Sequence, residues 1–183
     1  MIDKKGNLDH YQSFISWKHR IGENTTFVGG IHMQKFGFNK EIAVEPRLAL
    51  KWQFLPGQSL HAGFGLHSKN EPIPVYFSLQ RTEDGTEQMP NKDLALTKAR
   101  HFVLGYDVQI NANIHAKVET YYQSLYDVPV ENNPNSSFST INMQWGYSDI
   151  DLVNEGTGTN YGVEMTLERF FNDNYYYMIT ASV

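Results

Sequence analysis

Histidine is the residue type with the strongest metal-binding chemistry in this chain, which has seven histidines and no cysteine. His61 and His67 share one face of an expected strand, but at roughly 3.3 Å per residue they lie about 20 Å apart, too far for one ion. His32, His101 and His115 also fall on polar strand faces, where a polar lining recruits histidine without metal. The lack of cysteine excludes Cys-ligated zinc, thiol nucleophiles and disulfides. We therefore predict no metal site.

Two pairs of carboxylates could imitate general acid–base chemistry: Glu164 with Glu168 on one strand, and Asp107 with Glu119 on paired strands. Basic side chains on the same faces, such as Lys117, make ion pairing the simpler explanation. The glycine-containing stretches 63–65 and 156–158 are not phosphate loops, because neither joins a strand to a helix or precedes Lys and Ser/Thr. No nucleophile elbow or Ser/His/Asp arrangement is visible. We predict no catalytic residue, no cofactor and no enzymatic activity.

The elements that must position these side chains are strands, because apolar and polar residues alternate over eight stretches. The hairpin 45–67 is the clearest example: Leu48, Leu50 and Trp52 share one face, and Arg47 and Lys51 share the other. Its apolar face could equally cover a protein core or face lipid. The other expected strands are 9–21, 25–36, 101–110, 114–123, 161–170 and 175–183.

The connections between these strands alternate between about four residues and much longer segments, at roughly 36–44, 68–98 and 127–158. Loops of some 30 residues are rare in compact soluble domains. Several strands also exceed the usual five or six residues and reach the 9 to 11 of a tilted transmembrane strand. Aromatic residues near both strand ends suit two interfacial girdles. These features predict an all-β fold: an antiparallel transmembrane β-barrel segment of about eight long strands in four hairpins, with short periplasmic turns and long extracellular loops.

Composition narrows the class further. The mean hydropathy of -0.47 excludes a helical membrane protein, and no stretch approaches the roughly 18 apolar residues of a spanning helix. The net charge of -5 argues weakly against nucleic acid as a partner. Met1 is followed by the polar IDKKGN, so we expect no signal peptide.

Strand direction predicts an incomplete barrel. If the short turns are periplasmic, the first strand runs inward and the last runs outward, so both termini lie outside the cell, unlike those of a self-contained small barrel. The chain also stops at ITASV without a terminal aromatic residue. We expect an internal piece of a larger barrel. The alternatives are a complete small outer-membrane barrel with a structural or adhesive role, and a soluble β-sandwich binding module.

Three stretches resemble TonB-dependent outer-membrane receptors, in particular those of the Bacteroidetes. They are PNKDLALTKARHFVLGYD, KVETYYQSLYDVPV and LVNEGTGTNYGVEMTLERFF. The Gly-x-Gly-x-Asn-x-Gly-x-Glu run of the third stretch is the most specific piece. The resemblance implies a 22-stranded barrel with a plug domain, taking up a scarce nutrient with energy from the TonB system. Residues 1–183 would then be a partial receptor barrel in the outer membrane, without plug, TonB box or final strand.

The implied partners are outer-membrane lipid, the plug domain of the same full-length chain, the TonB system acting through that plug, and a nutrient such as a siderophore, glycan, peptide or cofactor. The long loops are where we expect ligand contacts, because aromatic and amide side chains can stack on and hydrogen-bond such molecules. The candidate contacts are Tyr76, Phe77 and Arg81 in the second long loop, and Phe138, Trp145 and Tyr147 in the third.

Overall fold

A computed structural model describes residues 8–82, 84–143 and 146–183 of the chain. Its main sheet consists of β1 (His10–Ile21), β2 (Thr25–Phe36), β3 (Ile42–Leu55), β4 (Gln58–Lys69), β7 (Thr97–Asn111), β8 (Ile114–Glu131), β9 (Leu152–Asn172) and β10 (Tyr175–Ser182). The loop between β4 and β7 adds α1 (Ile73–Tyr76), the hairpin β5 (Gln80–Arg81) and β6 (Glu87–Gln88), and the 3-10 helix η1 (Pro90–Asp93). The 3-10 helix η2 (Thr140–Asn142) lies between β8 and β9.

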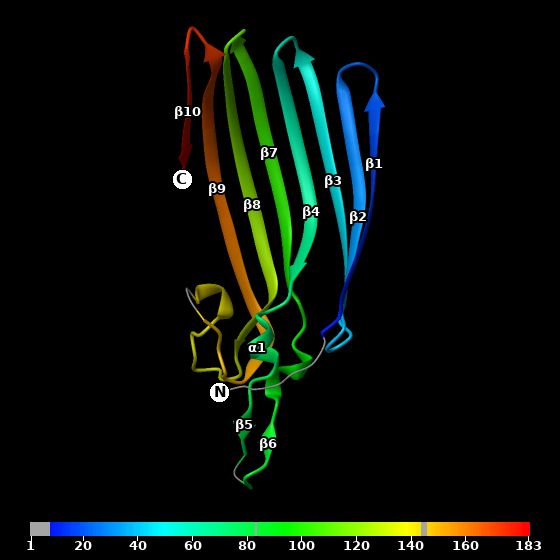
Figure 1. Cartoon of the computed structure of the whole chain (residues 1–183), viewed down its shortest axis with the longest axis vertical. Helices are drawn as coiled ribbons and strands as arrows, with labels where there is room; N and C mark the ends of the chain where they lie inside the picture. The colour runs from blue at the N-terminus through cyan, green and yellow to red at the C-terminus, as the bar shows by residue number, and fades with distance from the viewer. Residues whose placement is uncertain (1–7, 83, 144–145) are drawn as a thin grey trace.

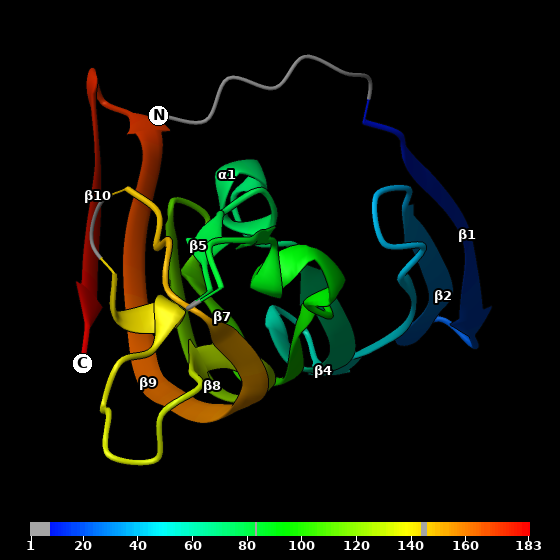
Figure 2. The same ribbon diagram turned by 90° about the horizontal axis from the view of Figure 1, so that it is seen from below.

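The eight long strands form one antiparallel sheet in the order β1-β2-β3-β4-β7-β8-β9-β10 (Figure 1). Among these eight strands, the order in the sheet is therefore the order along the chain. Viewed from the loop end, the sheet is an open arc with α1 over its hollow side (Figure 2). The antiparallel barrel segment is confirmed. Within the described residues the sheet does not close on itself and no second sheet packs against it face to face, so neither the closed small barrel nor the β-sandwich matches this structure.

Tight turns join the strands at one end of the sheet and the longer loops lie at the other end (Figure 1). In the turn after β3, Gly57 has a φ of +73°. A type II turn requires this left-handed value at its third position, and glycine adopts it without strain. The alternation of short and long connections expected from the sequence is therefore present.

Alternation of residue type follows the register of the strands. Leu48 lies opposite Phe64, Leu50 opposite Ala62, and Trp52 opposite Leu60, all on one face. We call this convex, mainly apolar side the outer face. The intervening residues, including Lys51 and its partner His61, lie on the concave inner face. The register thus keeps apolar side chains together across the sheet.

β8 and β9 are much longer than their alternation predicts, and they reduce the expected loop 127–158 to residues 132–151. Asp127 has a positive φ of 54°, and the pairing of β8 with β9 shifts register between Leu125 and Val130. A bulge of this kind interrupts the two-residue period without ending the strand. It also accommodates Pro129, which cannot donate to a ladder hydrogen bond.

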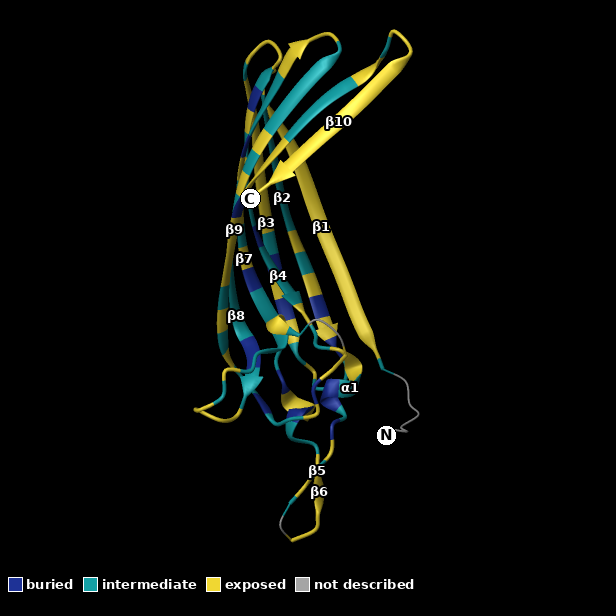
Figure 3. Cartoon of the chain, turned by 90° about the vertical axis from the view of Figure 1, so that its left-hand side faces the viewer, coloured by how far each residue is buried: buried dark blue, intermediate teal, exposed yellow. Residues whose placement is uncertain are grey.

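The outer face exposes large apolar side chains along the whole sheet. Trp17 is 61% exposed, Leu104 55% and Tyr161 77%. All residues of β1 and β10 are exposed (Figure 3). Contiguous apolar surface of this extent is costly in water and typical of a surface that faces lipid or another protein. No helix among the described residues is long and apolar enough to cross a membrane.

The buried hydrophobic residues gather at the loop end of the sheet. We call this group the loop core, and it consists of Phe36, Val75, Tyr76, Leu94 and Leu152. The buried Asn91 bonds to two segments: its side chain donates to Ser78 Oγ (2.9 Å) and to the carbonyl of Ile150 (2.7 Å), and accepts from the backbone N–H of Leu152 (2.9 Å). The loops between β4 and β7 and between β8 and β9 are therefore packed into one unit.

Candidate functional site

A chain of charged side chains crosses the inner face near the tight-turn end. The ring of His61 on β4 lies between two carboxylates: Nδ1 is 2.9 Å from Asp107 Oδ2 on β7, and Nε2 is 2.9 Å from Glu119 Oε1 on β8. The carboxylates extend the chain, because Lys117 Nζ lies 2.6 Å from Glu119 Oε2 and His115 Nε2 lies 3.4 Å from Asp107 Oδ1. We call these five residues the inner ion chain.

Gly105 makes this arrangement possible. It is the register partner of both His61 and Glu119, and a Cβ added there would lie 2.2 Å from His61 Nε2. The imidazole thus occupies the space that any other residue on β7 would fill. A substitution at Gly105 would push His61 away from both carboxylates.

A second polar group lies toward the loop end of the inner face, around Glu45, which is only 3% exposed. Its carboxylate accepts hydrogen bonds from Gln34 Nε2 (2.8 Å), from the backbone N–H of Ser68 (2.9 Å) and from Ser68 Oγ (2.6 Å). His32 and Arg47 each lie 2.9 Å from its other oxygen. The backbone pairing of β3 with β4 ends on this side at Arg47 and Gly65. Glu45 therefore ties β2, β3 and β4 together where the ladder of backbone bonds stops.

These two groups have the chemistry of a charged wall and not of a reaction centre. Asp107 and Glu119 could imitate an acid–base pair in the sequence, but Asp107 lies beside His61 and His115, and Glu119 lies beside His61 and Lys117. Glu164 and Glu168 lie on β9 as the register partners of Glu119 and His115. Among the described residues, no group of three or more acidic, histidine or cysteine side chains is arranged to hold a metal ion.

Tyr76, one of the predicted ligand contacts, packs within the loop core. Tyr76 is 0% exposed, and its ring lies 5.1 Å from the Phe36 ring, centroid to centroid. Burial raises the pKa of Tyr76 to about 12, because the phenolate is poorly solvated in the loop core. Phe77 is half-buried and packs on Phe38, with ring centroids 4.7 Å apart. Sequence alone does not distinguish a loop aromatic residue that packs from one that meets solvent.

The other candidate residues lie apart from one another. Arg81 is exposed on the β5–β6 hairpin, which projects away from the sheet (Figure 3). Phe138 is partly buried and packs against the loop core. Tyr147 is 47% exposed, and Trp145 falls outside the described residues. The structure brings Phe138 near a groove but does not bring the candidate residues together into one site.

That groove lies in the loop between β8 and β9 and has a volume of about 540 Å³. We call it the rim groove. It runs between residues 130–142, which are the end of β8 and the first part of the loop, and residues 153–157 of β9. Its lining combines carboxylates, amides and hydroxyls with the ring of Phe138. The backbone of the β8–β9 loop lies to one side of α1 in both ribbon views (Figures 1 and 2). The sequence predicts Phe138 in a long loop with amide side chains, but it does not predict a groove, because residues 153–157 were expected to be loop and not strand β9.

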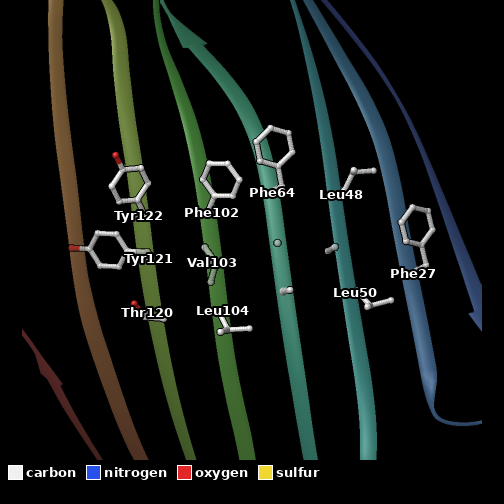
Figure 4. A pocket seen from close by; sticks show the side chains of 13 residues that line it. Phe27, Leu48, Leu50, Phe64, Phe102, Val103, Leu104, Thr120, Tyr121 and Tyr122 are labelled. Carbon is white, nitrogen blue, oxygen red and sulfur yellow. The ribbon is translucent and has the colours of Figure 1, made fainter.

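A second hollow of about 500 Å³ lies on the outer face, and we call it the outer groove. Ala62 is smaller than its register partners Leu50 and Leu104, so the surface dips between them. Phe27, Phe64 and Phe102 border the dip (Figure 4). Its lining is mainly apolar, which suits hydrocarbon.

Comparison with known proteins agrees with this architecture. Residues 5–183 match the family model "TonB dependent receptor-like, beta-barrel". No curated protein sequence matches the chain.

Several solved structures share the fold at low sequence identity. The siderophore receptor PirA from Acinetobacter baumannii superposes with a TM-score of 0.66 at 16% identity, over 93% of this chain and 27% of PirA. The outer membrane transporter YddB from Escherichia coli gives 0.61 at 12% identity, over 88% and 22%. The FrpB iron transporter from Neisseria meningitidis (F3-3 variant) gives 0.56 at 15% identity, over 91% and 25%.

The chain thus spans about a quarter of the length of these structures. The family match covers nearly the whole sequence, and the open sheet with short turns at one end and loops at the other is what a barrel wall requires. The chain belongs to the TonB-dependent receptor-like β-barrel family.

Proposed function

We propose that this chain forms part of the barrel wall of an outer-membrane receptor that takes up a scarce nutrient with energy from the TonB system. The observation that carries this proposal is the division of one sheet into an apolar outer face and a charged inner face, with packed loops at one end only. In a transmembrane barrel the outer face meets lipid and the inner face meets the lumen. The family is one of receptors and transporters, not of enzymes.

This proposal includes a complete receptor with further strands and a plug domain. Support comes from the open sheet and from neighbours about four times as long as this chain. The inner ion chain and the Glu45 group face the side where a plug would lie, so their charges contact the plug or line the solute path. The three sequence stretches that resemble Bacteroidetes receptors support an origin in that group.

The nutrient is a siderophore, glycan, peptide or cofactor that reaches the loops from outside the cell. Two of the structural neighbours are described as an iron transporter and a siderophore receptor, which is a statement about those proteins. Of the candidate contacts, Arg81, Phe138 and Tyr147 keep exposed surface and remain proposed contacts. Phe77 and Trp145 also remain proposals, whereas the burial of Tyr76 gives it a structural role.

Fractionation and uptake in the native host test this function. We expect the full-length protein in the outer-membrane fraction, running as a compact band on electrophoresis unless it is heated. Deletion of its gene should abolish growth on its nutrient, and deletion of TonB should do the same while leaving surface binding intact. A protein found in the soluble fraction, or uptake that persists without TonB, would contradict the proposal.

A further inference from the structure

The rim groove lies at the loop end and has a mainly polar lining, and the chemistry of its side chains indicates one class of ligand. Its volume of about 540 Å³ falls within the range of about 300–1,000 Å³ of small-molecule sites. The lining includes Glu131, Asn133, Ser137, Asn142 and Glu155. None of the lining residues is Lys, Arg or His, as far as the described chain shows.

The groove is built before any ligand arrives. Val130 pairs with Ser139 across the loop, and the N–H of Asn142 donates to the carbonyl of Ser139 (3.1 Å). Gly156 lies so close to β8 that a Cβ there would be 2.5 Å from Val130 Cγ1. These contacts fix the loop against β9. A pre-formed site loses less conformational entropy on binding than a loop that must become ordered.

Several lining groups have unused hydrogen-bonding capacity. Within the described part of the chain, the side chains of Glu131, Ser137, Asn142 and Glu155 make no hydrogen bond or ion pair. The two carboxylates accept, the hydroxyl of Ser137 donates and accepts, and the amide of Asn142 does both through separate atoms. The groove therefore provides donors and acceptors side by side.

This mixture excludes two ligand classes. An anionic ligand provides acceptors only and would lie against two carboxylates with no cation in the lining to offset the repulsion. A polyamine provides donors only, so it can pair with the two carboxylates but gains no hydrogen bond from the amide and hydroxyl donors of the groove. Hydroxyl groups donate and accept at the same atom, so they match both kinds of lining group.

The apolar part of the lining fits the same class. Phe138 is anchored on the loop core, and Ile141 and Val153 also line the groove. A sugar ring has an apolar C–H face and a hydroxyl rim, so it can lie on Phe138 while its hydroxyls reach the carboxylates and amides. We propose that the rim groove binds a neutral, polyhydroxylated ligand, with the chemistry of an oligosaccharide.

This inference rests on the proposed function in one respect, that the β8–β9 loop is exposed outside the cell. Two sources provide the same chemistry there: a transported oligosaccharide and the polysaccharide of the cell surface. Uptake separates them, because Glu155→Gln should reduce the uptake of a transported oligosaccharide, whereas a surface polysaccharide binds without being taken up.

The test uses the complete receptor in detergent and an array of neutral oligosaccharides, with a ferric tris-catecholate and spermidine as charged probes. We expect binding to a subset of the array and to neither charged probe. The affinity should change less than twofold between 50 and 500 mM salt, on the order of what a neutral ligand shows when screening has no ligand charge to act on. Binding to either charged probe in place of the array would overturn the inference.

Variants locate the site. Glu155→Gln and Asn142→Ala should each weaken oligosaccharide binding about tenfold or more, since each removes part of the hydrogen-bonding set. Glu87→Gln on β6 makes the same charge change away from the groove and should leave binding unchanged. Equal binding by all three variants would show that the ligand does not bind in the rim groove. Oligosaccharide binding without TonB-dependent uptake would remove the proposed function and leave this inference standing.

Discussion

The loop core and the sheet bury their apolar residues in opposite ways. In the loop core, Phe36 at the end of β2 and Tyr76 are almost completely enclosed by other side chains of this chain. In the sheet, Leu104 and Trp17 remain more than half exposed although they lie on long, regular strands. The loops therefore have a core that can form in water. The exposed face of the sheet needs a second apolar phase, and in the proposed function this phase is a bilayer.

This difference separates the forces that hold the two regions. The sheet is held by backbone ladders and by ties between strands on its inner face, such as His61 between Asp107 and Glu119. The loops are held by hydrophobic burial and by the hydrogen bonds of Asn91. The effect of a substitution on stability should accordingly depend more on the region in which it lies than on the residue type that is replaced.

Two phenylalanines provide the largest expected contrast. Phe36→Ala should destabilise the loop core by about 3–5 kcal/mol, because it removes a fully buried ring and leaves a cavity. Phe102→Ala on the outer face should change little by comparison, since lipid fills the space. Hydrogen exchange of residues 70–96 and 132–151 in the complete receptor measures the effect. Similar exchange in both variants would mean that the loops are not held by this core.

A charge placed on the two sides of β3 tests the assignment of its faces. Leu50→Arg should cost about 2–4 kcal/mol, because it places a guanidinium in hydrocarbon near the middle of the sheet. Ala49→Arg, one residue away, points to the inner face beside a hollow of about 440 Å³ and should be tolerated better. The effect of each variant can be measured as the amount of folded, heat-modifiable barrel in the outer membrane. Equal loss in the two variants would contradict the division into faces.

Alkaline pH should loosen the loops before the sheet. Burial raises the pKa of Tyr76 to about 12, so its neutral phenol is the form that the loop core favours. The contribution is complete below about pH 10 and decreases as the pH rises from about 10 to about 12, a total of about 2–3 kcal/mol. Hydrogen exchange of α1 against pH measures it. Tyr76→Phe keeps the packing without the titration, and an identical alkaline profile for that variant would assign the effect to another group.

The smallest effect is expected at the boundary between the regions. Lys98 Nζ on β7 lies 2.9 Å from Asp127 Oδ2 on β8, and both side chains are partly exposed. Because exposed ion pairs contribute little, Lys98→Gln should change stability by less than about 1 kcal/mol. Denaturant unfolding of the purified receptor provides the measurement. A loss comparable to that of Phe36→Ala would show that sheet and loops depend on this ion pair.

The sheet could be predicted from the sequence because its signals are local. The alternation in 45–67 and the Pro56-Gly57 turn identify a hairpin, and the register of the other hairpins follows from equally short turns. The full length of β8 could not be predicted, because the bulge at Asp127 breaks the two-residue period.

The sites were harder to predict because they depend on contacts between distant segments. His61 reaches Asp107 and Glu119 only because Gly105 leaves room, and register across three strands is needed to see this. Gly105, a residue without a side chain in the middle of an alternating strand, was the available signal. Tyr76 looked like a ligand contact because a loop sequence does not show that Phe36 will lie beneath it.

Spin-label accessibility tests the central claim, that the outer face meets lipid and the inner face meets the lumen. The chain has no cysteine, so single cysteines introduced at Leu50 and Leu104 on the outer face, and at Ala49 and Val103 on the inner face, can each be labelled alone within this segment. In the complete receptor reconstituted in liposomes, we expect the outer labels to collide more with oxygen and the inner labels less. Equal or reversed accessibility at neighbouring positions would contradict the account.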